Sequence, residues 1–106
     1  PSVGATTSGQ SSPEIDDLEK IFRYFMRSTH ISESVMLMKL GTRGQSFIDH
    51  ILPTLVRRQV MVEIDNRGGG VQRRYRLGVP LQRLNEGIGV ARGSFDRFLE
   101  QFPEPA

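Results

Sequence analysis

Apolar side chains recur every three or four positions in the first half of the chain, which is the spacing of an amphipathic helix. This spacing predicts one helix over residues 13–27, where Ser12 can accept a hydrogen bond as the N-cap. It predicts a second, shorter helix over residues 33–40, which Gly41 ends as a left-handed cap. The pattern breaks between the two helices for a few residues, which are expected to form a loop.

A third helix is expected from Thr42, which acts as its N-cap, to Arg58. Pro53 lies inside this helix, and its missing N–H removes one backbone hydrogen bond. The loss costs about 3 kcal/mol unless the packing adapts. The proline is therefore expected to kink the helix or to split it.

The pattern changes to alternation in residues 60–65 and again in residues 71–77, which is typical of half-buried β-strands. Between them lies Asn66–Gly70, with three consecutive glycines that tolerate positive φ angles. The sequence therefore predicts a β-hairpin with Arg67 at its tip.

Two further helices are expected after the hairpin. The apolar residues that follow Pro80 indicate a fourth helix, and Ser94 can cap a last one. The last helix carries an apolar stripe of three phenylalanines, Phe95, Phe98 and Phe102. Three roles are open for this stripe: the core of the domain, a dimer contact or a contact with a partner protein.

The length of 106 residues suits one domain, which is expected over residues 13–102. Residues 1–12 are small and polar without a hydrophobic period, so we expect a flexible tail or an interdomain linker. Residues 103–106 are expected to form a C-terminal tail. The first residue is Pro1 rather than Met, so we expect a fragment of a longer protein or a recombinant form with an altered start.

The composition narrows the chemistry that the chain can perform. The absence of cysteine excludes disulfides, thiol catalysis and thiolate metal sites. His30 and His50 have no acidic residues at ligand spacing, so no enzyme activity, metal or cofactor is expected. No apolar run approaches the roughly 20 residues of a membrane span, and no signal peptide is recognisable. We therefore expect no membrane contact and an intracellular protein, in the cytoplasm or nucleoid or in a eukaryotic nucleus.

The order of helix, short helix, tight turn, helix and β-hairpin resembles the winged helix-turn-helix family. The resemblance rests on SESVMLMKLG for the positioning helix, TRGQSFIDHILPTL for the recognition helix and VMVEID–NRGGG–VQRRYRL for the wing. It implies an α+β fold, with a three-helix core, a two-stranded β-hairpin wing and an additional C-terminal helix. The chain departs from the family at Gln59, where a glycine is common, and at Pro53 in the recognition helix.

The resemblance implies double-stranded DNA as the partner, with the third helix in the major groove and the wing on the backbone. By position, Arg43 can contact phosphate or guanine, Gln45 can read adenine, and Asp49 repels the backbone unless it finds a donor. The arginines of the wing are the best candidates for phosphate contacts. The full set of implied DNA contacts is Lys39, Arg43, Gln45, Ser46, His50, Arg67, Arg74 and Arg76.

A protein-interaction module within a larger protein or assembly is the alternative. The net charge is only +2, although the chain has twelve arginines and two lysines. Arg73, Arg74 and Arg76 can pair across the hairpin with Glu63 and Asp65, which leaves a salt-bridged surface rather than a phosphate-binding one. In this alternative the C-terminal helices contact a partner protein or a second copy of the chain.

Overall fold

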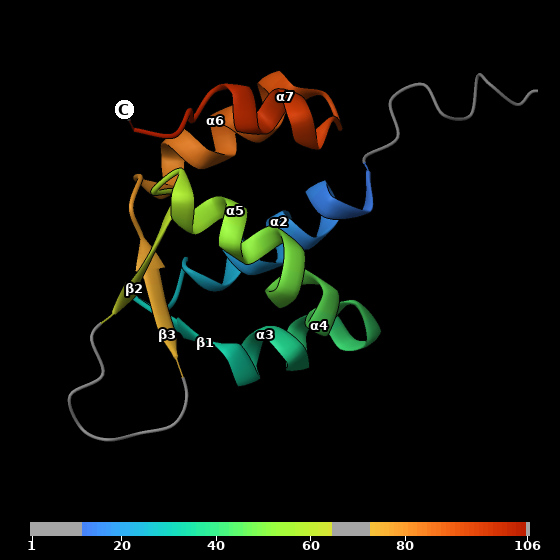
Figure 1. Ribbon diagram of the computed structural model, residues 1–106, viewed down its shortest axis with the longest axis vertical. Helices are drawn as coiled ribbons and strands as arrows, with labels where there is room; N and C mark the ends of the chain where they lie inside the picture. The colour runs from blue at the N-terminus through green and yellow to red at the C-terminus, as the bar shows by residue number, and fades with distance from the viewer. Residues whose placement is uncertain (1–11, 65–72, 106) are drawn as a thin grey trace, which may run out of the picture.

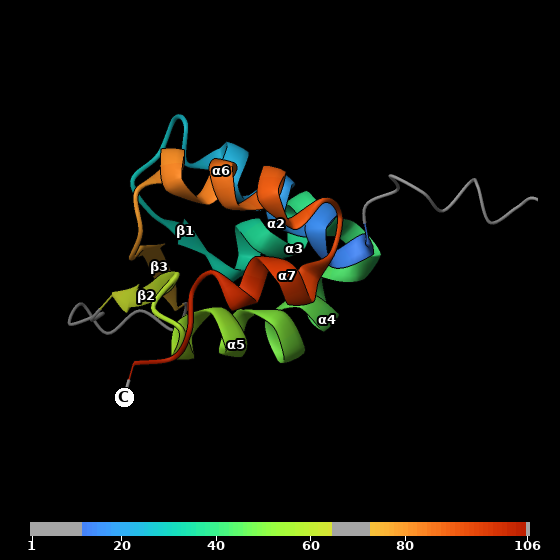
Figure 2. The same ribbon diagram turned by 90° about the horizontal axis from the view of Figure 1, so that it is seen from above.

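The computed structural model of the protein describes residues 12–64 and 73–105 (Figure 1). The expected hairpin tip at residues 66–70 and the expected tail up to residue 11 lie outside the described residues. The described part is a small α+β domain in which a three-stranded antiparallel sheet lies at one side of the helices (Figures 1 and 2).

Helix α2 (Pro13–Tyr24) begins as the sequence predicts, because the Ser12 hydroxyl accepts a hydrogen bond from the Ile15 amide at 3.3 Å. It ends at Tyr24, so the prediction of a helix to Arg27 is wrong by one turn. The amides of residues 25–27 bond to carbonyls three residues back, which tightens the chain into a turn. The apolar side of α2 is buried in the core.

Helix α3 (Glu33–Leu40) also follows the prediction, with the Ser32 hydroxyl accepting from the Val35 amide at 3.3 Å. Gly41 ends it with φ 59° and ψ −125°, a conformation that favours glycine. The next three residues, Gly41–Arg43, form a 3₁₀ turn, so the expected N-cap role of Thr42 is wrong.

The third helix is continuous in direction but not in hydrogen bonding. It consists of α4 (Gly44–Ser46), a π-helical segment (Phe47–Ile51) and α5 (Leu52–Arg57). The Leu52 amide donates to the Phe47 carbonyl, one residue further back than in an α-helix. The wider turn brings Pro53 into the first turn of α5, where its missing N–H is tolerated. The sequence predicts a kink or a split at Pro53, and the structure has a π-helical segment just before it.

The sheet has one strand more than the sequence predicts. Strand β1 (Ile31–Ser32) pairs with β3 (Arg74–Leu77), which also pairs with β2 (Met61–Ile64), so the order is β1-β3-β2. The two predicted strands pair antiparallel, as β2 and β3, but the sheet has three strands rather than two because β1 was not predicted. A strand of two residues has no alternating pattern to read, and it exists because β3 offers a free edge.

The turn between α5 and β2 uses Gln59 with φ 61°, at the position where the family often has a glycine. Gly78, just after β3, lies against this turn, and its amide donates to the Val60 carbonyl at 2.9 Å. A Cβ atom on Gly78 would overlap the Gln59 carbonyl oxygen. Only a glycine allows the two segments to come this close.

Helices α6 (Leu81–Ala91) and α7 (Phe95–Glu100) lie together at one end of the molecule (Figures 1 and 2). The Ser94 hydroxyl accepts from the Arg97 amide, as expected for an N-cap. Of the phenylalanine stripe, Phe98 and Phe102 are buried and Phe95 is half-buried. The ring of Phe98 packs against that of Phe22 at 6.1 Å, so the stripe mainly completes the core.

Candidate nucleic-acid interface

The outward face of the third helix carries most of the implied base-reading residues. Gln45, Ser46, Asp49 and His50 are all exposed along it. The Gln45 side-chain amide donates to Asp49 Oδ1 at 3.0 Å, an i to i+4 contact on the helix surface. Asp49 therefore finds its donor in Gln45. The other three exposed side chains named here carry an amide, a hydroxyl and an imidazole, so Asp49 is the one carboxylate among the four.

Arg43 points away from this face and into the domain. Its Nε donates to both oxygens of Asp17, at 3.1 and 2.9 Å, and its Nη2 lies 2.8 Å from Asp17 Oδ2. Asp17 is buried, with a side chain only 2% exposed. The hydrogen bond to Asp17 raises the pKa of the Arg43 guanidinium. The cation is thus committed to an internal carboxylate, although part of the arginine side chain stays exposed.

Arg73, just before β3, lies on the opposite side of the sheet from the two arginines of β3. Tyr75 is buried, so the alternation of a strand places Arg74 and Arg76 on the opposite, exposed face. Arg73 lies on the Tyr75 side, with its Nε 3.8 Å from Glu63 Oε2. Hydrogen bonding to Tyr75 and then the charge of Glu63 raise the pKa of Arg73. The expected pairing across the hairpin is therefore present for Arg73.

A hollow of about 490 Å³ lies between the third helix and the Tyr75 face of the sheet. Its apolar lining consists of Ile48, Leu52, Pro53 and Val56. The Tyr75 hydroxyl, which also lines the hollow, donates to Glu33 Oε2 at 3.2 Å. Burial and then the charge of Glu33 raise the pKa of Tyr75. The rim is of mixed charge and carries five ionisable side chains, Glu33, Asp49, Glu63, Arg57 and Arg73.

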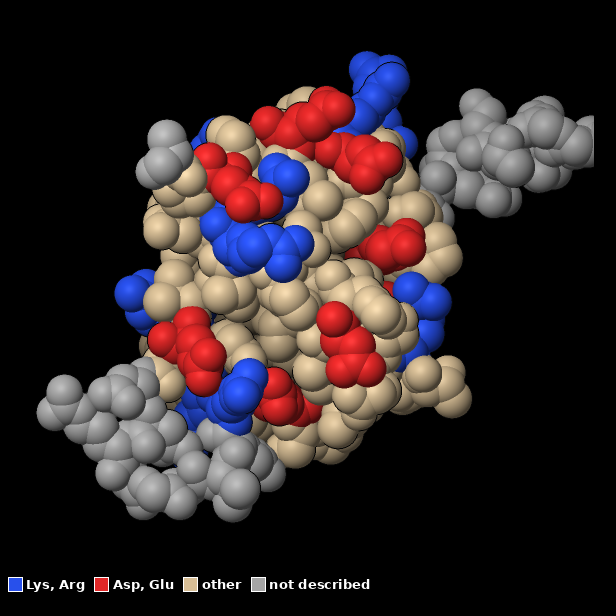
Figure 3. Space-filling model, in the orientation of Figure 1, with Lys and Arg blue, Asp and Glu red and all other residues tan. Residues whose placement is uncertain are grey.

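The mixed charge of this hollow continues over the whole face that carries α5, β2 and β3. Figure 3 shows acidic and basic side chains interleaved across it, without a continuous basic patch. Arg74 and Arg76 lie on the other face of the sheet from this hollow, so they point away from α5. Arg74 and Arg76 thus face a different side from the exposed face of the third helix, whereas the sequence predicts that the helix and these arginines contact one partner.

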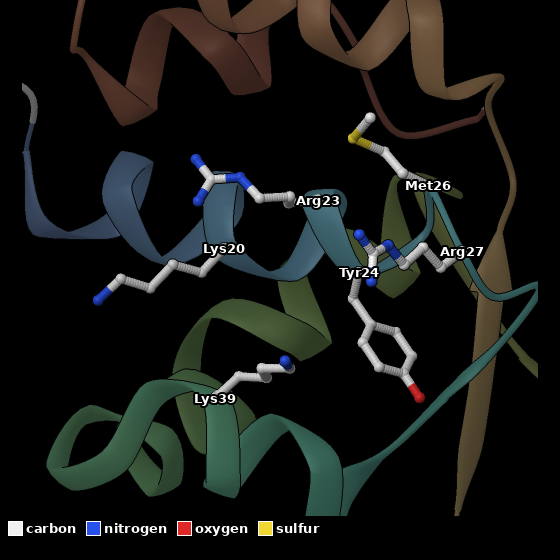
Figure 4. A pocket seen from close by; sticks show the side chains of 6 residues that line it. All are labelled: Lys20, Arg23, Tyr24, Met26, Arg27 and Lys39. Carbon is white, nitrogen blue, oxygen red and sulfur yellow. The ribbon is translucent and has the colours of Figure 1, made fainter.

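Lys39 lies apart from the other implied contacts, in a groove between α2 and α3 (Figure 4). Its Nζ is 5.6 Å from the centre of the Tyr24 ring, within range of a cation–π contact. Four cations line this groove of about 620 Å³, together with Tyr24 and Met26. The cations are Lys20, Arg23, Arg27 and Lys39.

Three of these four cations are absent from the sequence-based set of contacts. Lys20, Arg23 and Arg27 stand at i, i+3 and i+7, which places them on one side of the expected first helix. This spacing is the signal that could have identified the groove. In the sequence alone, this spacing cannot be distinguished from that of an ordinary solvent-exposed helix face, because only the fold places Lys39 opposite the three cations.

The structure therefore brings Gln45, Ser46 and His50 together and separates them from Lys39, Arg43 and the arginines of β3. Arg67 lies outside the described residues. Within residues 12–64 and 73–105, no group of three or more potential metal ligands is present. No helix in the same ranges has the length and apolar character that crossing a membrane requires.

Comparison of the chain with protein-family models, with curated proteins and with solved structures found no match.

Proposed function

We propose that this domain is a winged helix module that binds duplex DNA. In this proposal the helix from Gly44 to Arg57 enters the major groove. Gln45, Ser46 and His50 face the base edges. Arg74 and Arg76 lie on the outer face of the sheet, away from α5, and are the cations whose contact with the flanking phosphates the experiment tests. Arg43 remains on Asp17 and orients the start of the helix rather than contacting DNA.

The observation that carries the proposal is the uncovered polar face of this helix. Its apolar residues Phe47, Ile51 and Leu55 are buried, while Gln45, Ser46 and His50 are exposed. The strand order β1-β3-β2 and the three helices that precede β2 are compatible with a winged helix and support the same conclusion. Glutamine and serine can bond to base edges without adding charge.

The test is fluorescence anisotropy of a labelled duplex, titrated with the protein between about 50 and 200 mM salt. The variant Arg74→Gln/Arg76→Gln removes two charges from the exposed face of β3. If both contact phosphate, the slope of log K against log salt falls by about 2. The matched control Arg83→Gln/Arg97→Gln removes two charges from α6 and α7 and leaves the slope unchanged. Absence of duplex binding at the lowest salt would refute the proposal.

A protein-interaction module is the second candidate, and the carboxylates around the hollow favour it. Glu33, Asp49 and Glu63 lie where a DNA backbone would approach the third helix. The variant Asp49→Asn/Glu63→Gln separates the candidates. Its duplex affinity rises if DNA docks on this face. It stays at the wild-type value if the face contacts a protein.

Self-association through the C-terminal helices is a further form of this second candidate. Phe98 and Phe102 are already buried within the domain, which leaves the half-buried Phe95 and Leu99 for a contact between copies. Light scattering over a range of protein concentrations measures this directly. A monomer at every concentration would exclude the homodimer.

A further inference from the structure

The groove between α2 and α3 carries charge of one sign, unlike the hollow of mixed charge beside the third helix. Lys20, Arg23, Arg27 and Lys39 line it, and no carboxylate does. Figure 4 shows the side chains of Lys20, Arg23 and Arg27 along α2 and the turn after it, and that of Lys39 extending from α3 toward Tyr24. Cations that line one groove from two elements create a local positive potential.

These four cations are not neutralised by ion pairs with other described residues. The pairs found among residues 12–64 and 73–105 are Arg43–Asp17, Arg57–Glu104 and Arg73–Glu63, and none of them involves the groove. Glu19 lines an adjacent hollow that shares Arg23 and Met26, not the groove itself. The groove itself therefore keeps its positive charge.

The shape and spacing of the groove suit a linear polyanion better than a small anion. Lys20 and Arg23 stand three residues apart on α2, about 5 Å along the helix axis. A nucleic-acid strand in a duplex carries one negative charge for about every 3.4 Å of axis. Several consecutive phosphates can thus be contacted at once. Met26, which is 71% exposed, offers an apolar surface beside them.

We propose that the α2–α3 groove binds a nucleic-acid strand through its phosphodiester backbone. The guanidinium groups of Arg23 and Arg27 can each take a phosphate with two parallel hydrogen bonds, and Lys20 and Lys39 add point charges. The groove shares no lining residue with the hollow beside the third helix. It is therefore a second contact, independent of the duplex-binding face in the proposed function.

The experiment uses fluorescently labelled single-stranded oligothymidylate, which has no duplex to offer the third helix. The variant Lys20→Gln/Arg23→Gln/Arg27→Gln removes three charges from the groove at exposed positions. The matched control Arg83→Gln/Arg92→Gln/Arg97→Gln removes three charges from α6, α7 and the turn between them. Thermal denaturation of both variants verifies that each one is folded.

If the groove binds the strand, its variant weakens binding at least tenfold and lowers the salt slope by about 2, since each lost phosphate contact removes about 0.7. The control stays within about twofold of the wild type. Equal weakening by both triple variants would overturn the proposal, because net charge alone would then explain the binding. Competition by polyglutamate of matched charge as strong as that by unlabelled oligothymidylate would also overturn it, and would identify an acidic peptide as the better ligand.

The two proposals fail separately. The Arg74→Gln/Arg76→Gln variant keeps wild-type affinity for oligothymidylate if the groove is the binding site. Loss of duplex binding in that variant with retained strand binding supports both proposals. If the wild-type protein binds the strand but not the duplex, the proposal for the groove is supported and the proposal of a duplex-binding face is refuted.

Discussion

Asp17 and Arg43 join the first helix to the start of the third. The guanidinium of Arg43 contacts both oxygens of the Asp17 carboxylate, which is buried at the edge of the core. A buried carboxylate without a partner is strongly unfavourable, so the contact stabilises the position of α2 against α4. It also removes the cation that the family resemblance would assign to DNA.

The variant Asp17→Asn tests this contact. It keeps the size of the side chain but replaces a charge-assisted pair with a neutral amide, and we expect the free energy of unfolding to fall by about 1.5–3 kcal/mol. The matched control is Asp16→Asn, the exposed neighbour in the same helical turn, with an expected loss of about 0.5 kcal/mol. Denaturant unfolding measures both. Equal losses would mean that the Arg43 contact contributes little.

Two glycines, one tightly packed and one with open space around it, provide a test of the close packing between Gly78 and the turn at Gln59. Gly78→Ala introduces a Cβ that overlaps the Gln59 carbonyl, so we expect a loss of about 3 kcal/mol as the two segments move apart. At Gly89, in helix α6, a Cβ meets nothing within 4 Å. Gly89→Ala should therefore stabilise the protein by about 1 kcal/mol, through helix propensity. Thermal unfolding of both variants measures the contrast, which would be absent if the turn could shift without cost.

The helices could be predicted because their signals are local. Ser12 and Ser94 each cap a helix as expected, and Ser32 caps α3 in the same way, since an N-cap depends on residues three positions apart. Strand β1 could not be predicted, because its two residues depend on the free edge of β3. The apolar pattern predicts one continuous helix, although Pro53 lies inside it. The π-helical segment that accommodates the proline could not be predicted from the spacing of apolar residues.

The candidate site was predicted less well, for a related reason. Arg43 and Asp17 are 26 residues apart, and nothing local indicates that they meet. The alternation of side chains places Arg73 on the Tyr75 side of the sheet and Arg74 and Arg76 on the other side. It did not indicate that Arg74 and Arg76 point away from the third helix. The basic groove needs Lys39 from a second helix, so only tertiary structure brings it together with Arg23.

Gln59 offers a gain in stability rather than a loss. Its φ of 61° is unfavourable for a residue with a Cβ, by about 1–2 kcal/mol in a left-handed conformation. Glycine adopts the same φ without that cost but loses more chain entropy on folding. We therefore expect Gln59→Gly to stabilise the domain by about 0.5–1 kcal/mol. An unchanged or lower midpoint of denaturant unfolding would show that the turn carries no such strain.

Tyr75 links stability to alkaline pH. Its pKa is raised above the ordinary value of 10.0, first by burial and then by the charge of Glu33. The protonated hydroxyl is therefore favoured in the folded state, and the stability that it contributes is complete below pH 10. As pH rises above about 10, the unfolded chain loses this proton first, so stability falls until the folded-state pKa is passed.

The variant Tyr75→Phe isolates this effect, because it keeps the ring in the core and removes the ionisable group. The free energy of unfolding of the wild type should fall more steeply above pH 10 than that of the variant. Below pH 9 the difference between the two proteins should be constant. The ultraviolet absorbance of tyrosinate provides an independent measure, since Tyr75 should ionise at higher pH than the tyrosines of the unfolded chain. Parallel curves for the two proteins through this range would contradict the burial of the Tyr75 hydroxyl against Glu33.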